Sequence, residues 1–205
     1  AYITDMNQPL GRFIGNSIEV LECESIFTGK PALGFLPEAF NDTRELSLLL
    51  AAEMVYLAGR TASLHDARAL AEAKLASGEA FDAFQTMVTS QQGRWSEFAL
   101  PQNLSWRQIT ASTLGYVETF DSEKIGYAAV ALGAGRRKSD DLINPHASLI
   151  CHKKIGDAVQ PGETLFSYTH FREADSEVAK DFLATCCKIS LQKPPVPSLI
   201  LKKVT

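Results

Sequence analysis

Histidine, cysteine and serine side chains are the groups with which this chain could perform nucleophilic or metal chemistry. Nucleophilic catalysis needs a Ser or Cys beside a His and an orienting acid. The four histidines stand in no such signature, and the chain has no Gly-x-Ser-x-Gly turn. The histidines are His65, His146, His152 and His170. The last three could gather in space as a zinc site, but structural surface or strand histidines are the expected state, and we predict no catalytic residue among them.

The four cysteines show no disulfide framework and no metal or redox spacing. They are Cys23, Cys151, Cys186 and Cys187. The last two are adjacent, which is not the spacing of a ligand or redox pair. We therefore predict buried, reduced thiols and a cytoplasmic protein.

Residues 133–138, Gly-Ala-Gly-Arg-Arg-Lys, have the composition of a phosphate-binding loop. Such loops use the free amides at a helix N-terminus, where the helix dipole is positive. These glycines instead follow a predicted helix. The expected role is a C-terminal cap, with cations that complement the negative end of the dipole.

A second glycine-punctuated segment, residues 156–165, resembles a turn of biotinyl- and lipoyl-like barrel-sandwich domains. Its glycines are expected at positive φ, and Val159 and Leu165 are expected in the core. A carrier domain would also need an exposed lysine at a hairpin tip. No such hairpin is apparent, because Lys153 and Lys154 come before the turn, so we predict that the turn is architectural.

The positioning elements divide into a helical first half and a mixed second half. Asp42 and Glu45 predict a capping box, and Ser63 predicts the cap of the next helix. The first-half helices are expected at about 15–27, 42–57, 63–78 and 79–92, with Leu46, Leu49, Leu50 and Val55 inward on the second.

In the second half, alternating and β-branched segments predict strands, after a linker over 93–105. The strands are expected at 106–111, 113–120, 147–153, 164–170 and 198–204. Asp121 predicts the cap of a short helix that ends at Gly133, with Ile125, Ala128, Ala129 and Leu132 buried. A second helix is expected over 173–186, with Val178, Phe182 and Leu183 inward.

Composition places the chain among folded proteins. Its 205 residues are 45% hydrophobic and 21% charged, which excludes wholesale disorder. The formal net charge is −4 and gives no basic face for nucleic acid. Its longest apolar stretches are too short to span a bilayer, and no signal peptide is visible. We therefore expect neither nucleic acid nor a membrane as a partner.

Several motifs in order resemble the thymidine and pyrimidine-nucleoside phosphorylase family. The opening stretch Ile-Thr-Asp-Met-Asn-Gln-Pro-Leu-Gly at 3–11, with Ile-Gly-Asn at 14–16, is the most specific of them. The segments at 46–57, 128–136 and 152–159 continue the resemblance in the same order, and nearly the whole chain is covered.

This resemblance implies the fold and the domain division. Residues 1–105 are expected to be the mostly helical C-terminal part of the family's large α/β domain, and 106–205 its barrel-sandwich-like C-terminal α/β domain. The resemblance also implies an enzyme that cleaves pyrimidine nucleosides with inorganic phosphate as co-substrate. The family's phosphate-binding and base-binding groups have no match in this sequence, so we expect no catalytic or substrate-binding residue here and an inactive isolated chain.

One site does carry over by resemblance. Family members bind a potassium-like cation, and its ligands from this region are two backbone carbonyls and one carboxylate, which map onto Leu10, Phe13 and Glu22. The other ligands would come from a part of the family's sequence that has no match here. A hard cation takes oxygen ligands, so these groups suit the role. The resemblance also implies a homodimer when the protein is complete.

Two alternatives stay open from the sequence. The first is a non-catalytic assembly domain or one half of a split enzyme. The second is a lipoyl-like carrier, which would require a modified lysine.

Overall fold

The computed structural model describes residues 1–204, apart from the side chain of Ser96. Two compact units are present: Ala1–Glu19 with Leu100–Thr205, called here unit 1, and Val20–Ala99, called unit 2. The first residues of the chain therefore pack with its second half. The expected family domains, 1–105 and 106–205, are a different division and stay a prediction.

Unit 2 is helical. Its elements are the body of α1 (Ser17–Thr28), η1 (Pro37–Phe40), α2 (Asn41–Leu57), α3 (Leu64–Ala76), α4 (Glu79–Ser90) and η2 (Trp95–Phe98). The cap of α3 is confirmed, because the Ser63 hydroxyl accepts a hydrogen bond from the Asp66 amide at 3.1 Å. An aromatic cluster closes this unit, with Phe27 stacked on Phe84 at a centroid distance of 5.3 Å and Trp95 edge-on to both Phe81 and Phe84.

Two expectations for α2 are wrong. Its N-cap is Phe40, which makes no side-chain cap, and Asp42 lies inside the first turn. Its buried residues are Leu48 and Ala52, while Leu50 is 43% exposed. The reason is that residues 48–52 are all apolar, so periodicity cannot select the face that is buried.

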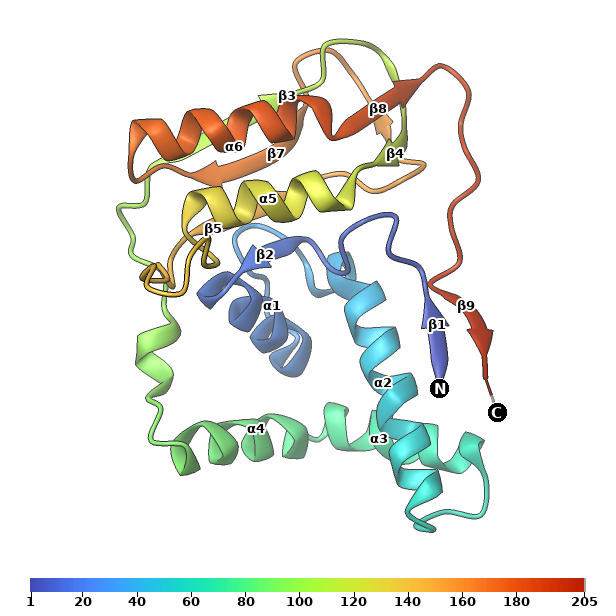
Figure 1. Cartoon of the computed structure of the whole chain (residues 1–205). Coiled ribbons are helices and arrows are strands. Elements are labelled where there is room, and N and C mark those ends of the chain that lie inside the picture. The colour runs from blue at the N-terminus through green and yellow to red at the C-terminus, as the bar shows by residue number, and fades with distance from the viewer. Residues whose placement is uncertain (205) are drawn as a thin grey trace. The chain divides into compact units, whose positions relative to one another are not determined.

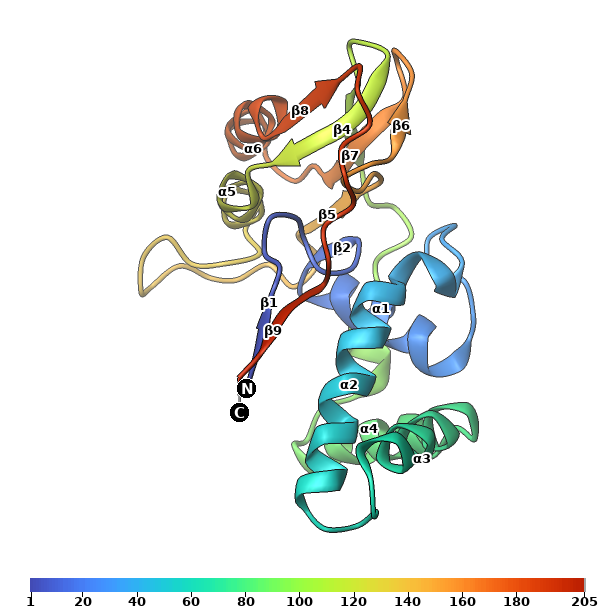
Figure 2. The same ribbon diagram turned by 90° about the vertical axis from the view of Figure 1, so that its right-hand side faces the viewer.

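Unit 1 contains three antiparallel sheets. Their strand orders are β1-β9, β2-β5-β7-β3 and β6-β4-β8. The strands are β1 (Tyr2–Thr4), β2 (Phe13–Gly15), β3 (Trp106–Thr110), β4 (Gly115–Phe120), β5 (Ser148–Cys151), β6 (Ala158–Val159), β7 (Thr164–Thr169), β8 (Cys187–Ser190) and β9 (Ile200–Lys203). Helices α5 (Ser122–Leu132) and α6 (Glu173–Thr185) lie side by side against these sheets (Figures 1 and 2).

One core joins the two larger sheets of unit 1 to both helices. Val117 on β4, Leu149 on β5 and Phe166 on β7 are each 0% exposed. Helix α5 buries all four residues expected to point inward, and its Asp121 cap is confirmed by a 3.1 Å bond from the Lys124 amide. On α6 the expectation is confirmed for Leu183, which is 1% exposed, and Phe182 packs partly buried against the core. The expectation for Val178 is wrong, because its neighbour Ala179 is the residue that is buried.

The mixed α/β fold class is confirmed. The two larger sheets face one core, and neither closes on itself within the described strands. Sequence patterns did not predict β1, β2, β6 or β8, because runs of two to four residues are too short to show a period. Across residues 1–204, no helix is both long and apolar enough to cross a bilayer.

Candidate functional site

Of the expected cation ligands in unit 1, Phe13 begins β2, at the edge of the sheet β2-β5-β7-β3, and Leu10 lies in the loop before it. Strand β2 is an edge strand that pairs with β5, with Phe13 opposite Ile150. The hydrogen-bonded position falls one residue earlier, where the Arg12 carbonyl accepts from the Cys151 amide at 2.8 Å. Antiparallel ladders alternate, so the Phe13 carbonyl faces away from β5.

The loop that carries Leu10 is bound tightly to the turn after β5. We call residues 8–12 the N-terminal loop. The Lys154 ammonium donates to the Pro9 carbonyl at 2.5 Å and to the Gly11 carbonyl. The Ile155 amide donates to the side-chain oxygen of Gln8 at 3.0 Å. Two of the motifs that carry the family resemblance, at 3–11 and 152–159, are therefore one structural feature.

Arg12 adds a second connection between the same segments. Its guanidinium donates to the His152 carbonyl at 2.6 Å and more weakly to the Cys151 carbonyl at 3.4 Å. Hydrogen bonds from a charged donor are about twice as strong as neutral ones. Two cations thus hold the N-terminal loop through backbone oxygens.

Glu22, the third expected ligand, lies on α1 in unit 2. Its side chain is only 4% exposed. One carboxylate oxygen accepts a hydrogen bond from the Thr43 hydroxyl at 2.7 Å. A buried carboxylate is costly unless hydrogen bonds or a cation compensate it. Leu10 and Phe13 belong to unit 1 and Glu22 to unit 2, so their joint role as ligands stays a prediction.

The three expected ligands fit a potassium ion by donor type. All would contribute oxygen atoms, two from backbone carbonyls and one from a buried carboxylate, and hard cations take such ligands. Within residues 1–204, no group of His, Cys, Asp and Glu side chains could hold a metal ion. Oxygen donors of this kind suit a hard cation, and the assignment of these three residues to potassium stays a prediction.

The glycine turn after β5 is architectural. Gly156 has φ +93° and Gly162 φ +84°, as expected for tight turns. Val159 is fully buried and Leu165 nearly so. Lys153, which precedes the turn, forms a 2.5 Å ion pair with Glu163, and this contact lowers the pKa of Glu163. Neither Lys153 nor Lys154 stands at an exposed hairpin tip, which argues against a lipoyl-like carrier.

The glycine pair at 133–135 caps a helix. Gly133 is left-handed at φ +101°, and its amide bonds back to the Val130 carbonyl. The backbone amides of Arg137 and Lys138 then donate to the Asp141 carboxylate, which lowers the pKa of Asp141. The amides of residues 133, 134, 137 and 138 are thus bonded within the chain, and the capping interpretation of Gly133 is confirmed.

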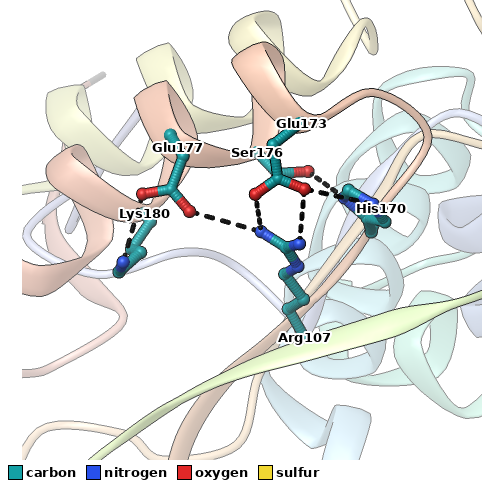
Figure 3. A network of polar contacts seen from close by, with 6 residues as sticks. All are labelled: Arg107, His170, Glu173, Ser176, Glu177 and Lys180. Atoms are coloured by element: carbon teal, nitrogen blue, oxygen red, sulfur yellow. Dashed lines mark hydrogen bonds and ion pairs between the residues drawn. The ribbon is translucent and has the colours of Figure 1, made fainter.

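The histidines do not gather as a zinc site. His152 bonds to the Ser167 hydroxyl at 2.8 Å on β7, and burial, with Arg12 and Lys153 nearby, lowers the pKa of His152. His170 bonds to the Ser176 hydroxyl at 2.6 Å. Figure 3 shows His170 beside an ion-pair network on the surface of α6.

That network joins β3 to α6. Arg107 forms two parallel bonds to Glu173, at 2.9 and 2.7 Å, and a longer one of 3.3 Å to Glu177, which also pairs with Lys180 (Figure 3). The Glu173 side chain is 65% exposed. Exposed pairs of this kind contribute little to stability, and the contacts connect secondary-structure elements instead of framing a pocket.

The thiols of unit 1 are inert. Burial raises the pKa of Cys151 to about 11 and the pKa values of Cys186 and Cys187 to about 12. Cys151, Cys186 and Cys187 form no disulfide. Thiols with raised pKa values stay protonated at neutral pH, which makes them weak nucleophiles.

Comparison with known proteins decides the family. Residues 116–190 match the family model described as the pyrimidine nucleoside phosphorylase C-terminal domain. The whole chain is 36% identical to a pyrimidine-nucleoside phosphorylase of Geobacillus stearothermophilus, of which it covers 46%. The chain belongs to the pyrimidine-nucleoside phosphorylase family. A relative from Staphylococcus haemolyticus is 35% identical over the whole chain, and one from Staphylococcus aureus is 36% identical over 88% of it.

The chain spans less than half the length of these phosphorylases, 46% of the first and 41% of the Staphylococcus aureus protein. Within the family motifs, sequence analysis missed the contacts of Lys154 and Arg12 with the N-terminal loop. The one hint in the sequence was that the motifs at 3–11 and 152–159 both contain polar side chains close to a glycine. No local pattern connects positions that lie 139 to 145 residues apart.

Proposed function

We propose that this chain is part of an enzyme that cleaves pyrimidine nucleosides with inorganic phosphate. Thymidine, and also uridine or deoxyuridine, would yield the free base and a pentose 1-phosphate, a pentosyl transfer used in nucleoside salvage. The observation that carries this proposal is the similarity to named pyrimidine-nucleoside phosphorylases along the whole chain.

The proposed reaction is a displacement at the anomeric carbon. A phosphate oxygen forms a bond to that carbon while the bond to the base nitrogen breaks, and the base leaves with the electron pair and takes up a proton. Positive charge develops on the sugar and negative charge on the base. Catalysis therefore needs donors aimed at the phosphate and at the base carbonyls.

In this proposal the chain contributes scaffold and cation ligands, while the reactive groups lie in the part of the relatives that it does not cover. The sequence offered no phosphate-binding motif. In the described residues, His152 and His170 are engaged in structural contacts, and the buried thiol of Cys151 has a raised pKa. Thymidine phosphorolysis by the isolated chain is therefore expected to be absent.

The proposed role of Leu10, Phe13 and Glu22 is to hold a potassium ion in the complete enzyme. The ion would supply positive charge near the bound phosphate. We also propose a homodimer. The cytoplasmic location that we propose is favoured by the reduced thiols of Cys151, Cys186 and Cys187.

The test is a phosphate-dependent assay of thymine release from thymidine, with uridine as second substrate. It compares the protein isolated at its native length with the 205-residue chain. Release by a longer native protein and none by the chain is the expected result. Release by the 205-residue chain would contradict the placement of the reactive groups, and no release by a longer native protein would contradict the activity.

A second candidate is a non-catalytic domain or one half of a split enzyme. The absence from residues 1–204 of a group of three or more His, Cys, Asp or Glu side chains that could hold a metal ion favours it. An intact native mass of 22.4 kDa, equal to the chain itself, together with no activity would support this alternative. A larger native mass would oppose it.

A further inference from the structure

Lys154 occupies a cradle of backbone oxygens. Its ammonium is 2.5 Å from the Pro9 carbonyl and also bonds the Gly11 carbonyl, although these residues lie far apart from it in sequence. The side chain is partly buried. An ammonium among carbonyl oxygens has the charge and ligand type of a bound monovalent cation.

The two carbonyls that Lys154 binds flank Leu10. The Pro9 carbonyl belongs to the peptide unit that precedes Leu10. The Gly11 carbonyl belongs to the peptide unit that follows the one containing the Leu10 carbonyl. Gly11 is in the left-handed region at φ +64°, so the chain turns sharply here. Holding the peptide units on both sides restricts the rotation of the Leu10 carbonyl between them.

The surrounding contacts support this arrangement. The side-chain oxygen of Gln8 accepts a hydrogen bond from the Ile155 amide at 3.0 Å. The Lys154 backbone amide donates a hydrogen bond to the Asp157 carboxylate at 2.8 Å. These backbone hydrogen bonds therefore hold the turn that carries Lys154 independently of the contacts that its ammonium makes with the N-terminal loop.

We propose that Lys154 is a positioning residue whose ammonium serves as a built-in monovalent cation and fixes the N-terminal loop. It takes the carbonyls of Pro9 and Gly11 and leaves the carbonyl of Leu10 oriented for the potassium ion. This last consequence rests on the proposed function, whereas the fixing of the loop does not.

Lys153 is the matched control, because it is the adjacent lysine and also partly buried. It pairs with Glu163 at 2.5 Å and donates to the Ala158 carbonyl at 3.2 Å, both beside the glycine turn. Substituting Lys153 removes one positive charge from the same segment without touching Pro9 or Gly11.

The first measurement uses the unsubstituted chain. Amine acetylation followed by mass spectrometry should label Lys154 at least about tenfold more slowly than the exposed Lys138, since local opening must precede reaction. Equal labelling rates would overturn the proposal. This measurement stands even if a Lys154 variant does not fold.

The second measurement is hydrogen exchange of Lys154→Met, Lys154→Arg and Lys153→Met. Amides of the N-terminal loop and of Ile155 should exchange roughly tenfold faster in Lys154→Met, because two charge-assisted bonds are lost. Lys154→Arg should retain most of the protection, and Lys153→Met should match the unsubstituted chain there. Unchanged exchange in Lys154→Met, or an equal rise in Lys153→Met, would contradict a positioning role.

The third measurement separates this proposal from the proposed function. In the native-length protein, Lys154→Met should raise several-fold the potassium concentration that half-activates phosphorolysis, and Lys153→Met should not. An unchanged potassium titration would remove the link between Lys154 and the ion. If the unsubstituted protein cleaves no nucleoside while labelling and exchange behave as expected, the proposed function fails and the role of Lys154 in the loop stands.

Discussion

The two units of this chain bury their apolar residues to very different degrees. Unit 1 surrounds one core with two sheets and two helices, and its large residues Phe166, Leu149 and Leu183 are 0–1% exposed. In unit 2 the helices bury few large side chains, and Leu57 and Met54 on α2 are 79% and 65% exposed. The comparison shows that helical periodicity alone does not produce a core, because each apolar face also needs a partner within reach.

The largest expected effect comes from removing a core ring in unit 1. Phe166→Ala should lower the free energy of unfolding by about 3–5 kcal/mol, because it leaves a cavity beside Phe120, whose ring centroid is 5.8 Å away. Urea denaturation followed by circular dichroism measures this. Leu50→Ala in unit 2 is the control and should change stability by less than about 0.5 kcal/mol. Equal effects would remove the contrast between the units.

An intermediate effect is expected at the two helix caps, one in each unit. Asp121→Ala and Ser63→Ala each remove one side-chain acceptor at 3.1 Å from a helix amide. Each should cost about 0.5–2 kcal/mol, and the cost should be similar in both units because capping is local. Thermal denaturation of both variants provides the measurement. Substituting Asn at either position, in place of Ala, should restore most of the lost stability. If the Asn variant is as unstable as the Ala variant, the loss does not come from capping.

The smallest effect is expected at the surface network of unit 1. The hydrogen bond from Arg107 lowers the pKa of Glu173 in the folded state. The network therefore stabilises the fold above the unfolded-state pKa of Glu173 and loses this contribution as the pH falls through the lower, folded-state pKa. Arg107→Gln should raise the Glu173 pKa, measured by NMR titration, and its effect on stability should shrink in acid and in high salt. A Glu173 pKa that does not move would show that the ion pair does not form in solution.

Local features were predictable from sequence, and contacts across the chain were not. Asp121 and Ser63 were predicted as caps because the acceptor and its amide lie three residues apart. The glycine cap at Gly133 follows from the same locality. By contrast, the contact of Lys154 with Pro9 joins residues separated by 145 positions, for which no spacing rule exists.

The same limit applies to the candidate site, whose residues no local sequence pattern could identify. Leu10, Phe13 and Glu22 could be named only from family resemblance, because backbone carbonyls leave no trace in residue types. The face of α2 that is buried could not be chosen, since Leu48, Leu50 and Ala52 are equally apolar by type and differ only in what lies opposite them.

The pairing of β1 with β9 has a consequence for how the molecule acquires its structure. Tyr2 lies opposite Lys203, and Phe13 opposite Ile150 (Figures 1 and 2). Each of these strands is synthesised well before its partner strand, while the helices between them can already form. Closing a loop of this length is slow, so β1 and β2 stay unpaired, and open to mispairing, after those helices have formed.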